Sequence, residues 1–332
     1  MQNKGIDYYA QGVIGCNRLV MAKTITLIES TLPEHQELAR QVMDSLLPHT
    51  GKAVRLGITG VPGAGKSTFI ESFGTMLTQK GLRVAVLAVD PSSPRTGGSI
   101  LADKTRMEKL SVNEQAFIRP SPSGGTLGGV ARKTRETMMI CEAAGYDVIM
   151  VETVGVGQSE VAVASMVDFF LVLMIAGAGD ELQGIKKGVL ELADAITVNK
   201  ADGDNVERAK LARAQYETAM HLLSPPSPDW STPVLMCSSL AGSGLEDIWE
   251  TVLKHRKIMN DKGDLEKKRS EQSRLWMWAL VKEGLEEWFS KNAQVVNLLP
   301  LIEKEVDSGK ITATSVAARI LSFIQNYALT TT

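Results

Sequence analysis

Residues 60–67 carry the clearest chemical signal in the sequence. They read GVPGAGKS and lie between an expected strand and an expected helix. Glycines let backbone N–H groups turn inward around phosphates, and the start of the following helix adds positive potential. Lys66 would neutralise β/γ-phosphate charge and the Ser67 hydroxyl can ligate Mg²⁺, so the pattern predicts a nucleotide phosphate site. The residues assigned to this site are Gly60, Val61, Pro62, Gly63, Ala64, Gly65, Lys66, Ser67 and Thr68.

A second motif, Asn199-Lys200-Ala201-Asp202, directly follows an apolar run and is expected at the same edge of the sheet as the phosphate site. A carboxylate only accepts hydrogen bonds, so Asp202 can receive the N1–H and the exocyclic amine of guanine, whereas adenine presents an unprotonated ring nitrogen. The motif therefore favours GTP over ATP. Asn199 would brace the loop or the purine edge, and the stem of Lys200 would lie along the base. Backbone N–H groups for the guanine oxygen are expected from Ser238, Ser239 and Leu240.

Acids at or beyond the ends of two other strands are candidates for a Mg²⁺ site. Glu152 precedes Gly155 as in the DxxG element of GTPases, with glutamate in place of aspartate. Because glutamate is one methylene longer, it could serve a metal-bound water or the nucleophile as well as the metal. Asp90 ends another apolar run, and Asp103, beyond a segment rich in glycine and serine, could equally start a helix.

The residues near Gly155 predict slow hydrolysis by the isolated chain. Gln158 lies three residues after Gly155, not directly after it, so no residue is preset to orient water as in Ras-like enzymes. We expect turnover to stay slow until a partner or a second copy completes the site. Residues 177–188, with four glycines and two lysines, suit either a hinged loop that contacts nucleotide or partner, or a loop into an amphipathic helix.

Short apolar runs alternate with helical patterns after residue 52. Because the runs are continuous, they predict strands covered on both faces, in a doubly wound, mostly parallel α/β sheet. They cover residues 54–59, 84–89, 116–119, 148–152, 169–175, 195–199 and 234–237. Helical patterns flank them, so three parts are predicted: an N-terminal helical extension (1–51), a nucleotide-binding domain (52–258) and a C-terminal helical module (259–332).

The C-terminal module has an apolar stripe at helical spacing, in which tryptophan is frequent. Such a stripe must be buried, either against the α/β domain or at a subunit interface. Its members are Leu275, Trp278, Val281, Leu285, Trp288 and Phe289.

Composition excludes several classes of function. The net charge is −2 with acids and bases interspersed, which argues against nucleic-acid binding as the main activity. The longest apolar run, 169–179, is too short to span a membrane, and the first twenty residues show no signal or transit pattern. The three cysteines are far apart in the sequence, which indicates a reducing compartment, and each is expected to be a small buried hydrophobic residue. The four histidines form no metal-binding spacing and are expected at the surface or on helices. We expect a cytoplasmic protein that binds neither nucleic acid nor membrane.

Four longer strings resemble the MeaB/ArgK family of P-loop GTPases. They are DPSSP at 90–94, GGSILADKTRM at 97–107, ETVGVGQSE at 152–160 and QGIKKG at 183–188. The likeness covers nearly the whole chain, including both helical extensions. It implies a P-loop NTPase fold whose C-terminal helices form a dimerisation arm, which favours the interface interpretation of the apolar stripe.

The resemblance also implies a function. Family members are homodimeric GTPases that chaperone an adenosylcobalamin-dependent acyl-CoA mutase, typically methylmalonyl-CoA mutase, gating cofactor loading and protecting the enzyme. GTP or GDP would be the bound nucleotide, and no cobalamin site is expected in this chain. Residues 177–188 match the family's third switch loop. By the family's motifs, the Mg²⁺ site is Ser67, Asp90, Asp103 and Glu152, the guanine reader is Asp202, and the catalytic groups are Lys66, Asp90, Glu152 and Lys186.

Three other classes of P-loop protein are alternatives to this function. Family members have been labelled kinases of an arginine/ornithine transport system, and a P-loop can transfer phosphate to acceptors other than water. The guanine motif, and a sequence without a dedicated acceptor pocket, argue against that reading. A nickel-delivery GTPase should carry Cys and His clusters, and a protein-targeting GTPase a Met-rich or basic helical domain. The sequence shows neither feature.

Overall fold

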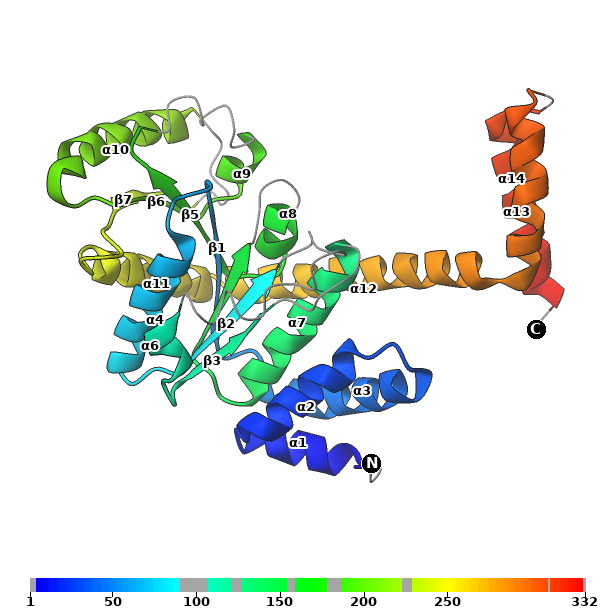
Figure 1. Ribbon diagram of the computed structural model, residues 1–332, viewed down its shortest axis with the longest axis horizontal. Coiled ribbons are helices and arrows are strands. Elements are labelled where there is room, and N and C mark those ends of the chain that lie inside the picture. Colours follow the sequence, from blue (N-terminus) through cyan, green and yellow to red (C-terminus); the bar gives the residue numbers. More distant parts are fainter. Residues whose placement is uncertain are drawn as a thin grey trace. The chain divides into compact units, whose positions relative to one another are not determined.

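Seven apolar stretches form one parallel sheet in the computed structural model (Figure 1). The structure describes residues 4–89, 107–120, 127–153, 159–177, 187–222, 229–309 and 311–330. The strands are β1 (Val54–Gly60), β2 (Val84–Val89), β3 (Ala116–Arg119), β4 (Val148–Thr153), β5 (Phe169–Ile175), β6 (Ala195–Asn199) and β7 (Val234–Met236). The predicted α/β sheet is confirmed. β1 and β4 each run one residue further than expected and β7 ends one residue earlier.

The strand order places β1 at the centre of the sheet. The order is β3-β2-β4-β1-β5-β6-β7, with every neighbouring pair parallel. All carboxyl ends therefore meet at one edge, where ligands bind in open α/β sheets. The register sets Ile58 of β1 beside Glu152 of β4, and Gly60 beside Leu173 of β5. The phosphate segment and Glu152 thus begin at adjacent strand ends.

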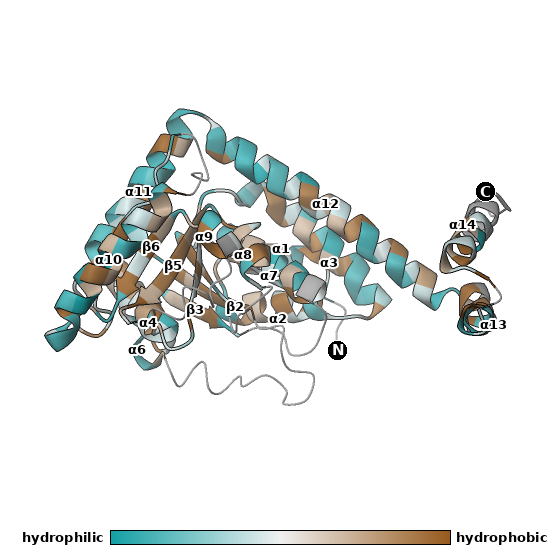
Figure 2. Cartoon of the chain, turned by 90° about the horizontal axis from the view of Figure 1, so that it is seen from above, coloured by the Kyte–Doolittle hydropathy of each residue, from teal (hydrophilic) through white to brown (hydrophobic). Residues whose placement is uncertain are grey.

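Helices cover both faces of this sheet, as its continuous apolar strands require. Helices α4 and α6 lie on one face, α7 and α8 on the other (Figure 1), and Figure 2 shows the apolar strands between them. The Trp249 ring of α11 packs edge-to-face against the Phe73 ring of α4, so α11 lies on the same side of the sheet as α4. The bounds are α4 (Lys66–Gln79), α6 (Glu108–Ser111), α7 (Leu127–Ala143), α8 (Ser159–Ala164), α9 (Lys187–Glu191), α10 (Val206–His221) and α11 (Leu245–Asp261), with 3-10 turns η1 (Leu47–His49) and η3 (Gly203–Asn205).

Three N-terminal helices pack on one another and on α7. They are α1 (Ile6–Ile14), α2 (Arg18–Glu29) and α3 (Pro33–Leu46). Asn17 caps α2, its side chain accepting from the N–H groups of Leu19 and Val20. Gly12 permits close packing of α1 on α2, because a Cβ there would lie 2.4 Å from Val20 Cγ1.

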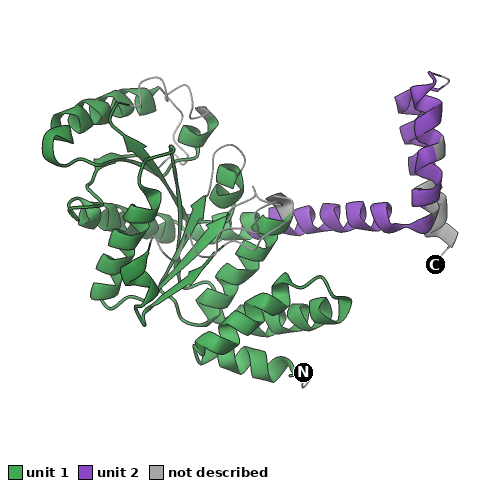
Figure 3. Ribbon diagram, viewed as in Figure 1, with its two compact units in different colours: residues 1–272 green, residues 273–332 purple. Residues whose placement is uncertain are grey.

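The chain divides into two compact units, residues 1–272 and 273–332 (Figure 3). The C-terminal helices are α12 (Asp264–Lys291), which crosses this division, α13 (Ala293–Asp307) and α14 (Ala313–Thr330). Between α11 and α12 the chain breaks at Gly263, whose φ of +71° lies in the left-handed region that favours glycine and commonly ends a helix. Among the described residues, no helix is long and apolar enough to cross a membrane.

The first turns of α12 are bound to the amino edge of the sheet. Arg269 pairs with Asp168, with Nη2–Oδ2 at 2.6 Å and Nε–Oδ1 at 2.8 Å, and also donates to the Ala53 carbonyl at 2.8 Å. Asp168 is buried and accepts from the Arg55 N–H at 3.0 Å. Lys268 Nζ donates to the Asp168 carbonyl at 2.8 Å. One helix start thus holds the beginnings of β1 and β5.

Candidate nucleotide site

The loop between β1 and α4 has the backbone shape that its glycines predict. Gly60, Gly63 and Gly65 have φ values of +156°, +78° and +83°. A Cβ on Gly60 would lie 2.2 Å from the Leu173 carbonyl oxygen, so only glycine fits there. Gly65 occupies the left-handed N-cap of α4, and a Cβ on it would lie 3.1 Å from Asn199 Nδ2. The loop therefore leads into the start of α4 at the carboxyl edge, where N–H groups can face an anion.

The Lys66 amine is held inside this loop. Its Nζ donates to the Gly60 carbonyl at 2.9 Å. Partial burial lowers the pKa of Lys66, and the carboxylates of Glu152 and Glu160 act in the opposite direction. A phosphate entering the loop would meet a positioned cation that it helps to keep protonated.

Ser67 and Glu152 supply two adjacent oxygen donors. Ser67 Oγ donates to Glu152 Oε1 at 3.5 Å, and the Glu152 side chain is buried. In the next residue of β4, Thr153 Oγ1 donates to Thr59 Oγ1 at 2.8 Å, which ties β4 to β1. Hydroxyl and carboxylate oxygens are the donors that Mg²⁺ prefers, so this pair fits the ion, which when bound would neutralise phosphate charge.

The other predicted metal and switch residues lie outside the described residues. These are Asp90, Asp103, Gly155, Gln158 and Lys186, together with most of 177–188. In the described part of the chain, no group of three His, Cys, Asp or Glu side chains could hold a metal ion.

Asn199 connects the phosphate loop to the predicted base-reading loop. Its Nδ2 donates to the Ala64 carbonyl at 2.8 Å, and its Oδ1 accepts from the Ser239 N–H at 3.0 Å and the Ser239 hydroxyl at 2.8 Å. The Cys237 thiol also donates to Oδ1 at 3.3 Å. The side chain is buried. Asn199 therefore fixes the two loops relative to each other.

Asp202 and Lys200 lie beside these loops. Ser238 Oγ donates a hydrogen bond to Asp202 Oδ2. Lys200 adopts a positive φ of +59°, and its carbonyl accepts from Asn205 Nδ2 at 2.7 Å. A Cβ on Gly65 would lie 3.8 Å from Lys200 Cε, so the lysine stem lies next to the phosphate loop. The predicted phosphate and base residues that the structure describes are thus gathered at one edge of the sheet.

A protein-family model described as Methylmalonyl Co-A mutase-associated GTPase MeaB matches residues 21–294. The chain belongs to the MeaB family. A putative GTPase of Caulobacter vibrioides is 55% identical over 317 residues, covering 96% of this chain and 97% of that protein. The mouse protein named methylmalonic aciduria type A homolog, mitochondrial, is 44% identical over 330 residues, covering 96% of this chain and 80% of that protein.

A solved structure gives the same result for the fold of this MeaB-family chain. The crystal structure of a LAO/AO transport system kinase has a TM-score of 0.78 and 38% identity, and covers 98% of this chain and 99% of that one. The resemblance drawn from the sequence is confirmed, and the chain is a P-loop GTPase.

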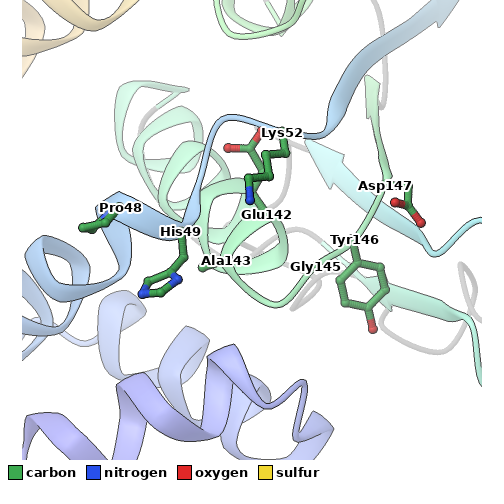
Figure 4. Close-up of a pocket in the computed structure, with 8 residues that line it drawn as sticks. All are labelled: Pro48, His49, Lys52, Glu142, Ala143, Gly145, Tyr146 and Asp147. Carbon is green, nitrogen blue, oxygen red and sulfur yellow. The ribbon is translucent and has the colours of Figure 1, made fainter.

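A pocket of about 260 Å³ lies at the opposite, amino edge of the sheet. Figure 4 shows that its lining side chains come from the segment before β1, the end of α7 and the turn before β4. Its acids already bind protein groups: Glu142 pairs with Arg55 at 2.7 Å, and Asp147 Oδ2 accepts from the Arg83 N–H at 2.8 Å. These contacts hold strand beginnings, so we do not assign the MeaB-family chemistry to this pocket.

The sequence did not predict the burial of His255. His255 was expected at the surface or on a helix; it lies on α11 but is buried against Phe169 and Trp230. Cys16 is only half-buried, whereas Cys141 and Cys237 are buried as expected. Burial raises the pKa of Cys237 to about 12, so its thiol is not a nucleophile at neutral pH.

We expect Asp202→Asn to reduce the preference for GTP over ATP by at least about tenfold, because the amide loses the charge that strengthens hydrogen bonds from guanine and presents a donor of its own. The dissociation constants of both nucleotides, measured by calorimetry, would test this. Asp204→Asn is the matched control, since Asp204 is exposed in the adjacent turn η3. Unchanged selectivity in Asp202→Asn would refute the base-reading assignment.

Proposed function

We propose that this MeaB-family GTPase is a chaperone of an adenosylcobalamin-dependent acyl-CoA mutase, with methylmalonyl-CoA mutase as the first partner to test. The observation that carries the proposal is the family match over residues 21–294, whose description names a mutase-associated GTPase. The name of the mouse relative, which refers to methylmalonic aciduria, supports the same partner. GTP binding and hydrolysis would gate cofactor loading and protect the mutase.

In this proposal GTP binds with its phosphates in the loop after β1 and its base at Asp202. Ser67 and Glu152, joined by Asp90 and Asp103, would hold Mg²⁺. Lys66, Asp90, Glu152 and Lys186 would act on the phosphates. The support is the gathering of the described members of this set at one sheet edge, with Ser67 3.5 Å from Glu152. We also propose the cytoplasm as the site of action.

We further propose that the protein is a homodimer through the apolar stripe of the C-terminal unit. Leu275, Trp278 and Leu285 are 60%, 55% and 61% exposed in the single chain. They recur at steps of three and seven residues on α12, so they lie along one helix face. Large apolar faces of this kind are typical of subunit interfaces. Sedimentation that gives a monomer at micromolar concentration would contradict this proposal.

The mutase partnership predicts a specific pattern of turnover. The purified chain alone should hydrolyse GTP slowly and ATP hardly at all, and methylmalonyl-CoA mutase from the same organism should accelerate GTP turnover by at least about tenfold. Phosphate release measured with and without the mutase tests this, with an unrelated acyl-CoA enzyme as the control. A rate of GTP turnover that the mutase does not change would refute this partner but not the GTPase activity.

A kinase linked to arginine/ornithine transport is the second candidate. The observation that favours it is the name of the solved relative, a LAO/AO transport system kinase. Phosphoryl transfer to another protein or to a small acceptor needs the same phosphate loop. In the experiment above, ATP turnover faster than GTP turnover, or labelled phosphate retained on an acceptor, would favour this candidate over the chaperone.

A further inference from the structure

Ser72 on α4 makes a hydrogen bond that is unusual for a helix serine. Serine and threonine hydroxyls within a helix commonly bond back to the carbonyl four residues earlier. Thr75 in the same helix does so, with Oγ1 donating to the Glu71 carbonyl at 2.7 Å. Ser72 instead donates across 167 residues to the Ser239 carbonyl, at 2.6 Å. The helix that starts at the phosphate loop is therefore bonded directly to the predicted base-reading loop.

The other hydrogen bonds of this loop show which backbone donor remains for a ligand. The N–H of Ser238 bonds to the Ser243 carbonyl, and the N–H of Ser239 to Asn199 Oδ1, both at 3.0 Å. The N–H of Ala241 bonds to Ser238 Oγ at 3.0 Å. Within the described residues, the Leu240 N–H is left without a protein acceptor, and Leu240 as a whole is 86% exposed.

The Ser72 bond acts on the same peptide group that carries this donor. The Ser239 carbonyl and the Leu240 N–H belong to one planar, trans peptide, in which they point in opposite directions. A hydroxyl that holds the carbonyl toward α4 therefore holds the N–H away from α4. Asn199 fixes the preceding N–H, so rotation of this peptide is restrained on both sides.

We propose that Ser72 is a positioning residue for base recognition, which orients the Leu240 N–H toward the six-position oxygen of guanine. The inference rests on the proposed function only in assigning guanine to Asp202 and the 238–240 loop. It adds a specificity determinant outside the nucleotide motifs. Because Ser72 lies one turn and a half beyond Ser67, α4 would join phosphate binding to base reading through a single rigid element.

Nucleotide analogues test the proposal with the full chain. Dissociation constants are measured by competition for GTP, for ITP, which keeps the six-position oxygen but lacks the two-position amine, and for the triphosphate of 2-aminopurine riboside, which lacks that oxygen. We expect Ser72→Ala to weaken GTP and ITP about three- to tenfold, the range of one hydrogen bond, and to leave the 2-aminopurine nucleotide unchanged. Ser72→Thr keeps a hydroxyl and should bind GTP within about twofold of the wild type.

Controls separate positioning from a general structural effect. Thr75→Ala removes a hydroxyl from the same helix whose bond stays within α4, and it should change none of the three constants. Equal weakening of all three nucleotides by Ser72→Ala, or no weakening of any, would overturn the proposal. A wild-type chain that binds GTP no better than the 2-aminopurine nucleotide would overturn the guanine assignment as well, so the two failures are distinguishable.

Discussion

Lys66→Ala should lower kcat for GTP hydrolysis by at least about 100-fold and leave the fold intact. Among the described residues, the Lys66 amine is the cation within the phosphate loop, where its Nζ lies 2.9 Å from the Gly60 carbonyl oxygen. Charge that develops on the transferred phosphoryl group is stabilised by such fixed cations, and removal of one preorganised donor costs about 10²–10³ in rate. Single-turnover phosphate release at saturating GTP would measure the effect.

A lysine at the other end of the same helix provides the control. Lys80 caps the C-terminus of α4 and pairs with Glu246 at 2.7 Å on the surface. Lys80→Ala should keep wild-type turnover, and both variants should unfold within a few degrees of the wild type because each loses only one partly exposed contact. Equal loss of activity in the two variants, or a Lys66→Ala chain that no longer folds, would contradict the assigned role.

The strands were predictable because each is buried on both faces. A run such as 169–175 must be apolar at every position between two helical layers, and this pattern appears in the sequence without any knowledge of its neighbours. The order of the strands is a different property. Strand β1 pairs with β4 and β5, whose residues come about a hundred positions after those of β1 in the chain, and no local pattern records such a pairing. The fold class thus followed from the sequence, and the topology did not.

The position of the candidate site could equally be predicted from the sequence, but the hydrogen bonds within the site could not. The motifs at 60–67 and 199–202 each follow a strand, and parallel strands must end at a common edge. By contrast, a lone serine in the middle of a helix has no distinguishing neighbours, so nothing in the sequence singled out Ser72. Its partner is a backbone carbonyl, which every residue has. Only the three-dimensional arrangement reveals that contact.

The charged residues of α12 differ in their environment in a way that the sequence does not record. Lys267, Lys268 and Arg269 are consecutive in a segment of mixed charge, which is typical of a solvated helix face. Lys267 is on such a face, with its side chain 76% exposed. The side chain of Arg269 is 15% exposed and pairs with buried Asp168, a hundred residues away. Lys267 and Arg269 therefore lie in the same sequence context, but only Arg269 compensates a buried charge.

That contrast predicts a large loss of stability in Arg269→Ala. The substitution leaves the Asp168 carboxylate buried without its ion-pair partner, which typically costs about 3–5 kcal/mol of the free energy of unfolding. Lys267→Ala, which removes an exposed ion pair with Asp264, should change it by less than about 1 kcal/mol. Denaturant unfolding followed by circular dichroism compares the two variants. Similar losses in both would show that the Asp168 contact is not the cause.

The pH dependence of this loss provides a second test of the same contact. Burial alone would raise the pKa of Asp168, but hydrogen bonding and charge from Arg269, with the charge of Arg55, hold it below its ordinary value of 3.8. The stabilisation by ionised Asp168 is therefore complete above about pH 4 and is lost as the pH falls through the lower, folded-state pKa.

In Arg269→Ala the same carboxyl is buried without that partner, so its pKa should rise and protonation should relieve the penalty. The difference in unfolding free energy between wild type and variant should therefore be largest near pH 7 and shrink on acidification, whereas a purely steric defect would give a difference that does not change with pH.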